Sequence, residues 1–362
     1  MPRKILNSKE KIAEIDKENV LGSIESLPDQ CKDAWEKANE VEVPESYKDI
    51  KNVVMTGMGG SGLGARVIES VFAPELSAPL TRVNDYDIPP FSDNHTLVIC
   101  SSYSGTTEEV VNNAKQAKDR NTKWMAIGTG NTLIELAENA GVPYYKIAPV
   151  YNPSNQPRMA IGYSVVGQLV LASKAGLFNL KGENIYEMVE AMRGVQKEVG
   201  QEVPFEKNAA KKLASKLKGK VIMYVSSRHL VGAMHTVNNQ LNENAKNVSF
   251  DVQIPELNHH LMEGLKHPDT NSDNIFVFFA NSEIYPDRIR KRYEVTMDVV
   301  EQNKIESYEY KLNSESRLTQ AFELIQFGAY VNFYLSLLYN QNPAPIPWVD
   351  YFKKKMGQPL GK

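Results

Sequence analysis

Short apolar runs alternate with longer amphipathic stretches through the first half of the chain. The runs that predict strands lie at 52–56, 80–83, 96–100, 124–127 and 144–147. The stretches that predict helices lie at 62–72, the second half of 101–117, 132–140 and the nearly all-apolar 161–175. Strands that alternate with helices indicate an α/β fold, with a parallel sheet covered by helices on both faces.

The second half of the chain repeats this pattern. Strands are expected at 220–225, 275–279 and 308–312, and helices at 229–244 and 317–339. Residues 8–48 are charge-rich with scattered apolar positions and predict two or three surface helices. We therefore expect a helical segment at 1–48, an α/β domain at 49–180, a linker helix at 181–203 and a second α/β domain with a C-terminal segment at 204–362.

Composition narrows the class of protein. The chain has 362 residues, 42% of them hydrophobic and 23% charged, which allows about two domains and excludes dominant disorder. Because 41 basic residues face 44 acidic ones, no basic surplus is available for a nucleic acid. No window reads as a membrane span or a secretory signal, so we expect a cytoplasmic location without a membrane partner. Cys31 and Cys100 are too few for a disulfide framework.

A glycine-rich turn is the first candidate for chemistry. Gly57-Met58-Gly59-Gly60-Ser61-Gly62 follows a predicted strand and precedes a predicted helix. Glycines there permit a tight turn and a close approach of backbone N–H groups to an anion. The spacing also fits a dinucleotide-binding loop, with Asp85 as the ribose-binding acid, and a turn without any ligand is a third reading.

A hydroxyl-rich loop favours a phosphate ligand. Ser102, Ser104 and Thr107 lie within six residues, again between a strand and a helix. Hydroxyl groups donate to phosphate oxygens, and a helix N-terminus adds partial positive charge. The alternative is that Thr106 caps the helix with Glu109 at the capping-box position, and that the serines are turn residues.

Three further segments carry charged or titratable groups. Arg158 lies at a helix start, where the helix dipole disfavours a cation, so it is either a ligand of an anionic substrate or an ordinary surface arginine. Glu243 lies among amides that would suit sugar hydroxyls, and it is either a general base or part of a solvated helix end. His259 suits a general acid, because imidazole titrates near neutral pH. The spacing of His259, His260 and Glu263 does not match a helical zinc site, so no metal is expected.

These motifs occur in the order of those in a known family. GMGGSG, SYSGTTEE, QPR, NENAK and PELNH resemble the motifs of the bifunctional phosphoglucose/phosphomannose isomerases, which have two sugar isomerase (SIS) domains. The resemblance runs from about Asn52 to Lys354 and implies two SIS-type three-layer sandwiches with mainly parallel five-stranded sheets. It also implies an enzyme that interconverts glucose 6-phosphate and fructose 6-phosphate without a cofactor.

The resemblance implies a role for each candidate residue. The substrate phosphate is bound by Gly60, Ser61, Ser102, Ser104 and Thr107. Glu243 transfers the proton between C2 and C1 through a cis-enediolate, and Arg158 stabilises the developing negative charge. His259, lent by the other subunit of a homodimer, and Lys353 open the sugar ring, with Lys354 as the alternative to Lys353.

Some readings stay open at this point. Thr106, His260, Leu261 and Ala344 depart from the family's usual residues, which leaves activity on mannose 6-phosphate open. A non-catalytic phosphosugar-binding protein would keep the hydroxyl loops without needing Glu243. An NAD(P)-dependent dehydrogenase, a sugar-phosphate epimerase and an amidotransferase half are further alternatives, although the last needs an N-terminal cysteine where this chain has Pro2.

Overall fold

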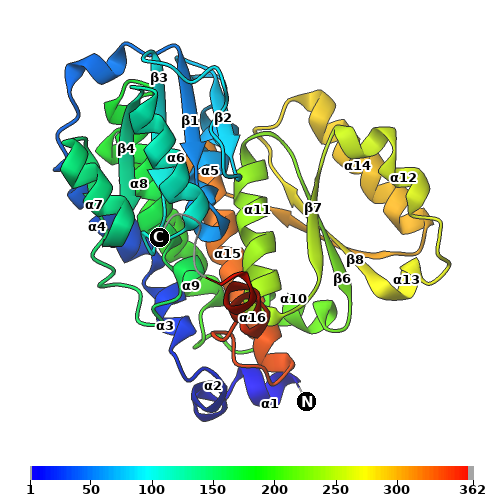
Figure 1. Cartoon of the computed structure of the whole chain (residues 1–362). Coiled ribbons are helices and arrows are strands. Elements are labelled where there is room, and N and C mark those ends of the chain that lie inside the picture. Colours follow the sequence, from blue (N-terminus) through cyan, green and yellow to red (C-terminus); the bar gives the residue numbers. More distant parts are fainter. Residues whose placement is uncertain (1, 358–362) are drawn as a thin grey trace. The chain divides into compact units, whose positions relative to one another are not determined.

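The apolar runs of the sequence form two separate parallel sheets in the computed structural model, which describes residues 2–357. Packing divides the chain into two units, named here after their sheets (Figure 1). The five-stranded unit comprises Ser26–Tyr186 and Ala344–Lys362, and the four-stranded unit comprises Met1–Glu25 and Glu187–Pro343. Helix α9 (Gly182–Val199) runs from one unit into the other.

The five-stranded sheet has the order β2-β1-β3-β4-β5, and every neighbouring pair is parallel. Its strands are β1 (Asn52–Thr56), β2 (Leu80–Val83), β3 (Thr96–Ser101), β4 (Lys123–Gly128) and β5 (Tyr144–Lys146). The five strands predicted from the apolar runs are therefore confirmed. The chain leaves β1 toward β2 on one side and later returns to β3 on the other, so the strand order reverses between β1 and β3.

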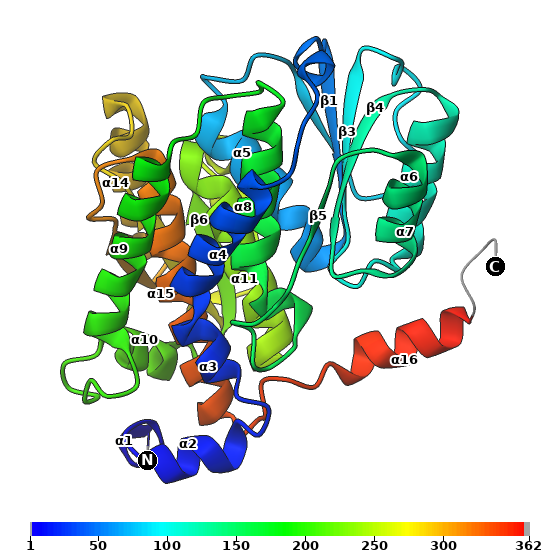
Figure 2. The same ribbon diagram turned by 90° about the vertical axis from the view of Figure 1, so that its left-hand side faces the viewer.

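Helices cover both faces of this sheet (Figure 2). They are α4 (Leu27–Asn39), α5 (Leu63–Phe72), α6 (Glu108–Asp119), α7 (Asn131–Ala140) and α8 (Ile161–Lys174). Helices α6 and α7 pack on one face, while α5 and α8 pack on the other and α4 packs against α8. Because α8 is enclosed by the sheet, α4 and α5, nearly all of its residues are buried, which explains its apolar sequence.

The remaining elements of this unit are short turns and one peripheral helix. The turns are η1 (Glu45–Lys48), η2 (Gly59–Gly62) and η3 (Pro157–Met159), and the helix is α16 (Pro347–Met356). Turn η2 leads from β1 into α5, and η3 leads into α8. The apolar core on the α6–α7 face joins Val54, Val98 and Ala126 of the strands to Val110 and Leu133 of the helices.

The second sheet has four strands among the described residues, so the expected fifth strand is wrong. The order is β7-β6-β8-β9, again fully parallel, with β6 (Val221–Ser226), β7 (Ser249–Gln253), β8 (Ile275–Asn281) and β9 (Glu306–Lys311). Strand β7 was not predicted. Its residues are partly exposed at the sheet edge, and a short run with only two apolar side chains gives little strand signal.

Helices also cover this second sheet. The N-terminal helices are α1 (Pro2–Leu6), α2 (Lys9–Ile15) and α3 (Val20–Glu25). The others lie at α10 (Ala209–Leu217), α11 (Val231–Gln240), α12 (Leu261–Gly264), α13 (Asn271–Asn274), α14 (Asp287–Gln302) and α15 (Arg317–Leu338), with turns η4 (Arg228–Leu230), η5 (Leu241–Ala245) and η6 (Glu256–His259). Helices α10 and α11 pack against α15, and α14 packs against β8 and β9.

Helix α15 forms the centre of this packing. Ser316 caps its N-terminus through a reciprocal pair of hydrogen bonds with Thr319. It is the one helix of the described chain whose length and hydropathy would suit a membrane span, and the whole apolar window is buried among other helices. Its apolar composition is thus accounted for by a position in the protein core.

Packing groups the terminal segments differently from the limits expected at 1–48, 49–180, 181–203 and 204–362. Helices α1 and α3 contact α15 and belong to the four-stranded unit, whereas α4 contacts α8 and belongs to the five-stranded unit. The expected limits follow the order of motifs along the chain, and the units follow the packing of segments that are distant in sequence.

Candidate phosphate-binding and catalytic site

The glycine-rich turn and the hydroxyl-rich loop interlock at the carboxyl ends of β1 and β3. The backbone N–H of Tyr103 donates to Ser61 Oγ over 2.9 Å, which ties one loop to the other. Ser102 Oγ lies 2.8 Å from Thr107 Oγ1 and accepts from the Gly105 N–H over 3.1 Å. The strand order reverses here, and such a reversal is where parallel α/β sheets bind ligands. The structure therefore gathers the predicted hydroxyls at the expected kind of place.

Two glycines let the backbones approach closely in this region. Gly105 has a φ of +71°, and a Cβ atom there would lie 1.8 Å from the carbonyl oxygen of Gly130. Gly60 lies against the chain at Pro157 and Arg158, where a Cβ atom would come within 3.4 Å of the backbone of both residues. The glycine turn is thus packed against the segment that carries Arg158, and a side chain at Gly105 would collide with the backbone at Gly130.

Helix α6 begins directly after the hydroxyl loop. Thr107 is its N-cap residue but makes no capping bond with its side chain, because the hydroxyl is paired with Ser102. The alternative reading of Thr106 as a capping residue is wrong, since its hydroxyl pairs with the exposed Ser104 over 3.1 Å. The hydroxyl groups and the positive end of α6 therefore belong to one loop, as an anion site requires.

Arg158 lies in turn η3, beside the glycine turn. Its side chain is only 3% exposed, so the reading as an ordinary surface arginine is wrong. The guanidinium donates to the carbonyl oxygen of Ala344 over 2.6 Å and to Gln156 Oε1 over 3.0 Å. A buried cation beside the glycine-rich turn is a strong electrostatic feature, because the surrounding protein screens its charge less than water does.

Sequence reasoning missed two residues of α8 that hold the glycine turn. Gln168 Nε2 donates to the carbonyl oxygen of Ser61 over 2.9 Å and to Ser101 Oγ over 3.2 Å. Ser164 Oγ donates to the carbonyl oxygen of Gly60 over 3.4 Å. The signal that could have found Gln168 is its position as the one amide in a mostly apolar helix, because a buried polar side chain needs a hydrogen-bond partner.

Glu243 lies in the four-stranded unit, on a turn that the sequence did not predict. The expected helix at 229–244 is α-helical only to Gln240, and Leu241–Ala245 forms a π-helical turn. Glu243 is half-buried, while Leu241 and Asn244 beside it are buried. The amides expected to face a sugar have other partners, since Asn238 and Asn242 both bind Ser249 of β7.

His259 and Lys353 are both exposed within the described chain. His259 ends turn η6, which is anchored by Asn258 through bonds to Thr296 over 2.8 Å and to Arg292 over 3.1 Å. Lys353 lies on α16, a helix with no buried residue. The structure thus joins the phosphate-loop residues and Arg158 in one unit, and it places Glu243 and His259 in the other.

The matching edge of the four-stranded sheet is filled by side chains. The strand order reverses there between β6 and β8, and Ser227 and Ser282 follow these strands. Tyr285 donates to the carbonyl oxygen of Ser227 over 2.9 Å, and Ser282 donates to Gln320 Oε1 over 2.7 Å. His229 Nε2 also lies 2.8 Å from that oxygen. Because these groups are buried and bind one another, the loops of the five-stranded unit are the better candidate for a phosphate site.

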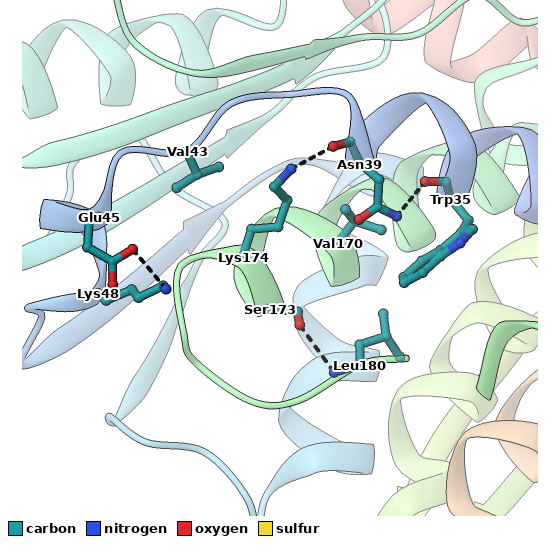
Figure 3. Close-up of a pocket in the computed structure, with 9 residues that line it drawn as sticks. All are labelled: Trp35, Asn39, Val43, Glu45, Lys48, Val170, Ser173, Lys174 and Leu180. Atoms are coloured by element: carbon teal, nitrogen blue, oxygen red, sulfur yellow. Dashed lines mark hydrogen bonds and ion pairs between the residues drawn. The ribbon is translucent and has the colours of Figure 1, made fainter. Parts of the chain in front are cut away.

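A cavity of about 400 Å³ lies elsewhere in the five-stranded unit, at the C-terminal ends of α4 and α8 (Figure 3). It is lined by Trp35, Asn39, Val43, Glu45, Lys48, Val170, Ser173, Lys174 and Leu180. Lys174 donates to the carbonyl oxygen of Asn39 over 2.6 Å, and Lys48 pairs with Glu45 over 2.9 Å. Along the axis of α8, the rise of a helix places Lys174 about 15 Å from Ser164. The cavity is therefore separate from the hydroxyl loops.

Metal-ligating side chains do not gather anywhere in residues 2–357: no group of three or more His, Cys, Asp or Glu residues is placed to hold an ion. His259 and His260 are adjacent, but the His260 ring is directed to Glu256 at 3.9 Å. Cys31 and Cys100 are both buried free thiols.

Comparison with known proteins gives consistent matches over both units. Residues 4–140 match the phosphoglucose isomerase family, and residues 206–356 match the bacterial phospho-glucose isomerase C-terminal SIS domain. A bifunctional phosphoglucose/phosphomannose isomerase from Caldicellulosiruptor bescii is 34% identical, over 93% of this chain and 98% of its own length. One from Aquifex aeolicus is 26% identical, over 88% and 95%. A hypothetical protein from Thermus thermophilus has the same fold, with a TM-score of 0.74, 16% identity and coverage of 100% of this chain and 94% of that one.

Proposed function

The chain belongs to the bifunctional phosphoglucose/phosphomannose isomerase family, and we propose from this premise that it interconverts glucose 6-phosphate and mannose 6-phosphate with fructose 6-phosphate. The single observation that best supports the proposal is the interlocked pair of loops joined by the Tyr103–Ser61 hydrogen bond. It forms a compact set of hydroxyl donors at a helix N-terminus, which suits a phosphate monoester.

Binding of the phosphate orients the reacting carbons. In the proposal, Ser61, Ser102, Ser104, Thr107 and the backbone at Gly60 hold the phosphate group, far from C1 and C2 of the sugar. This binding energy offsets the entropy lost when the open-chain sugar is held in one orientation. The side chain of residue 344 is not needed for the contact with Arg158, because that contact uses the backbone carbonyl, so the departure at Ala344 leaves it intact.

The proton transfer needs only groups of the chain. Glu243 removes the proton from C2 of the open-chain aldose, the C2–H electron pair forms a C1=C2 double bond, and the π pair of the C1 carbonyl moves onto O1, which gives a cis-enediolate. The hydroxyl proton of O2 then moves to O1, the C2 carbonyl forms, and the C1=C2 pair takes the proton from Glu243 at C1. Arg158 stabilises the negative charge on the enediolate oxygen. His259 and Lys353 transfer the protons that open the ring, one at the ring oxygen and one at the anomeric hydroxyl.

The proposed enzyme is a cytoplasmic homodimer that acts in glycolysis and gluconeogenesis. An exposed His259 on an anchored turn is compatible with donation of this histidine to the site of a second subunit. Two free buried thiols agree with a reducing compartment.

A direct test compares the wild-type chain with Glu243→Gln in coupled assays for both sugar phosphates, with and without EDTA. The glutamine keeps the volume but cannot accept the proton, so we expect turnover to fall by roughly 10²–10⁴-fold with both substrates. Equal wild-type activity with EDTA would agree with chemistry that needs no metal. If Glu243→Gln keeps turnover within about tenfold of the wild type, Glu243 is not the general base.

The main alternative is a phosphosugar-binding protein without catalysis. It would bind the sugar phosphates through the same loops, and neither sugar would be turned over by the wild-type chain. Calorimetric binding of fructose 6-phosphate together with zero turnover would favour this alternative.

A further inference from the structure

Glu243 lies on a turn with two uncommon backbone features. The π-helical turn Leu241–Ala245 ends α11, and turns of this kind are rare and occur frequently at functional sites. Lys246 follows with φ 52° and ψ 36°, in the left-handed region. Glycine or asparagine usually occupies that position after a helix, because other side chains are strained there. A lysine at this place indicates that its side chain has a use that glycine could not serve.

The ammonium group of Lys246 binds backbone carbonyl oxygens from two segments. Nζ donates to Asn244 over 3.3 Å, to Asn342 over 3.2 Å and to Pro343 over 2.9 Å. Three carbonyl oxygens match the three donors of an ammonium group, and a cation also favours the last carbonyls of a helix. One end of the Glu243 turn is therefore attached to the chain at 342–343, within the four-stranded unit.

The other side of the turn is attached to β7 through Asn242. Its Nδ2 donates to Ser249 Oγ over 2.9 Å and to the Ser249 carbonyl oxygen over 3.2 Å, and its Oδ1 accepts from the Ser249 N–H over 3.2 Å. Ser249 Oγ also donates to Asn238 Oδ1 over 2.7 Å, and Asn238 lies one helical turn before Asn242. Glu243 therefore lies between two neighbours, Asn242 and Asn244, whose positions are both held by hydrogen bonds.

We propose that Lys246 is a positioning residue for the Glu243 base: its ammonium group, bound to the carbonyl oxygens of Asn244, Asn342 and Pro343, holds the π-helical turn that presents Glu243 to the substrate. The inference rests on the isomerase function proposed above. Lys246 acts through Glu243, because the hydrogen bonds of its ammonium group join the backbone of the turn at Asn244 to residues 342–343. A general base loses rate steeply when it is displaced, since a shift of about 1 Å costs on the order of 10²-fold.

The chain offers a matched control in Lys211. Its ammonium group also binds two backbone carbonyl oxygens of the four-stranded unit, those of Gln201 and Val203, each over 2.8 Å. Lys211 is fully buried on α10, and neither of these two bonds involves the Glu243 turn. Lys246→Met and Lys211→Met therefore remove the same kind of bond from two places, one beside the base and one away from it.

The test measures kcat, KM for fructose 6-phosphate and Tm for the wild type, Lys246→Met, Lys246→Arg, Lys211→Met and Glu243→Gln. We expect Lys246→Met to lower kcat by roughly 10–100-fold with KM within about twofold, and Lys246→Arg to recover part of kcat. Lys211→Met should lower Tm while its kcat stays near the wild-type value.

Each result separates positioning from general stability. An unchanged kcat in Lys246→Met, or equal losses of kcat in Lys246→Met and Lys211→Met, would overturn the inference about Lys246. The proposed function would still stand if the wild type turns over substrate and Glu243→Gln does not. Zero turnover by the wild type would overturn both proposals. If Lys246→Met does not fold, the exposed Asn242 changed to Ala tests the other attachment of the turn, with the same split between kcat and KM expected.

Discussion

Buried polar side chains in this chain are defined by the groups they contact. His229 was expected only as the start of a helix, yet it is 3% exposed and lies between Gln320 and the ring of Tyr285. Burial lowers the pKa of His229 to about 4, from its ordinary value of 6.5, because the charged imidazolium loses hydration there. The folded chain therefore keeps this imidazole neutral at a pH where the unfolded chain protonates it.

The His229 shift predicts a stability loss in a defined pH window. Between pH 6.5 and about 4 the unfolded state binds the proton and the folded state does not, so the free energy of unfolding falls as the pH falls. Thermal unfolding of the wild type and His229→Gln across this window should show a shallower decline of Tm for the variant. Parallel Tm curves would mean that His229 titrates alike in both states.

At the scale of elements, α8 does more than cover the sheet. Ser164 in its first turn and Gln168 at its middle hold the glycine turn, while its C-terminal end borders the separate cavity. A nearly all-apolar stretch identifies such a helix as buried but does not say which of its polar side chains binds a partner. The lone Gln168 is used because the carbonyl oxygen of Ser61 points toward α8 and needs a donor.

Replacing the amide of Gln168 should weaken the attachment of the glycine turn to α8. Gln168→Leu keeps the approximate volume but leaves the Ser61 carbonyl oxygen and Ser101 hydroxyl without this partner, which costs about 1–3 kcal/mol. We expect a lower urea midpoint and a higher KM for fructose 6-phosphate, with kcat less affected. A leucine variant with unchanged KM would show that the loop keeps its geometry without α8. Gln116→Leu, on α6, removes an amide that binds the segment 86–88 instead of the glycine turn, and it is the control for loss of an amide.

At the scale of the whole molecule, the candidate groups are distributed over both units. The phosphate loops and Arg158 belong to the five-stranded unit, and Glu243 and His259 belong to the four-stranded unit. Under the proposal, a second subunit adds His259, so one complete site would need two chains.

Co-expression of two inactive variants tests this shared site. A mixed dimer of Glu243→Gln and His259→Ala would contain one site with both Glu243 and His259 intact, because each chain lends its histidine to the other. We expect the mixture to regain turnover that neither variant has alone. If His259 serves its own chain, both sites of the mixed dimer stay defective and no turnover returns. Separately tagged chains purified in tandem would provide the mixed dimer for this assay.

The sequence alone determined much of the local structure. The sequence predicted all five strands of the first sheet, and the three central ones, β1, β3 and β4, are apolar because a parallel strand buried on both faces is apolar along its length. The loops with Ser61, Ser102 and Thr107 were recognisable, because each is a short run of glycines or hydroxyl side chains between a strand and a helix.

Tertiary structure decided what depends on contacts between distant segments. The weak edge strand β7, the burial of Arg158 against Ala344 and the bond between Gln168 and Ser61 all follow from such contacts. The same holds for the π-helical turn at Glu243, which is attached by Asn242 to β7 and by Lys246 to residues 342–343. The physical reason is that local pattern sets which residues are apolar or hydroxyl-bearing, whereas the partner of each buried polar group is chosen only when the chain packs.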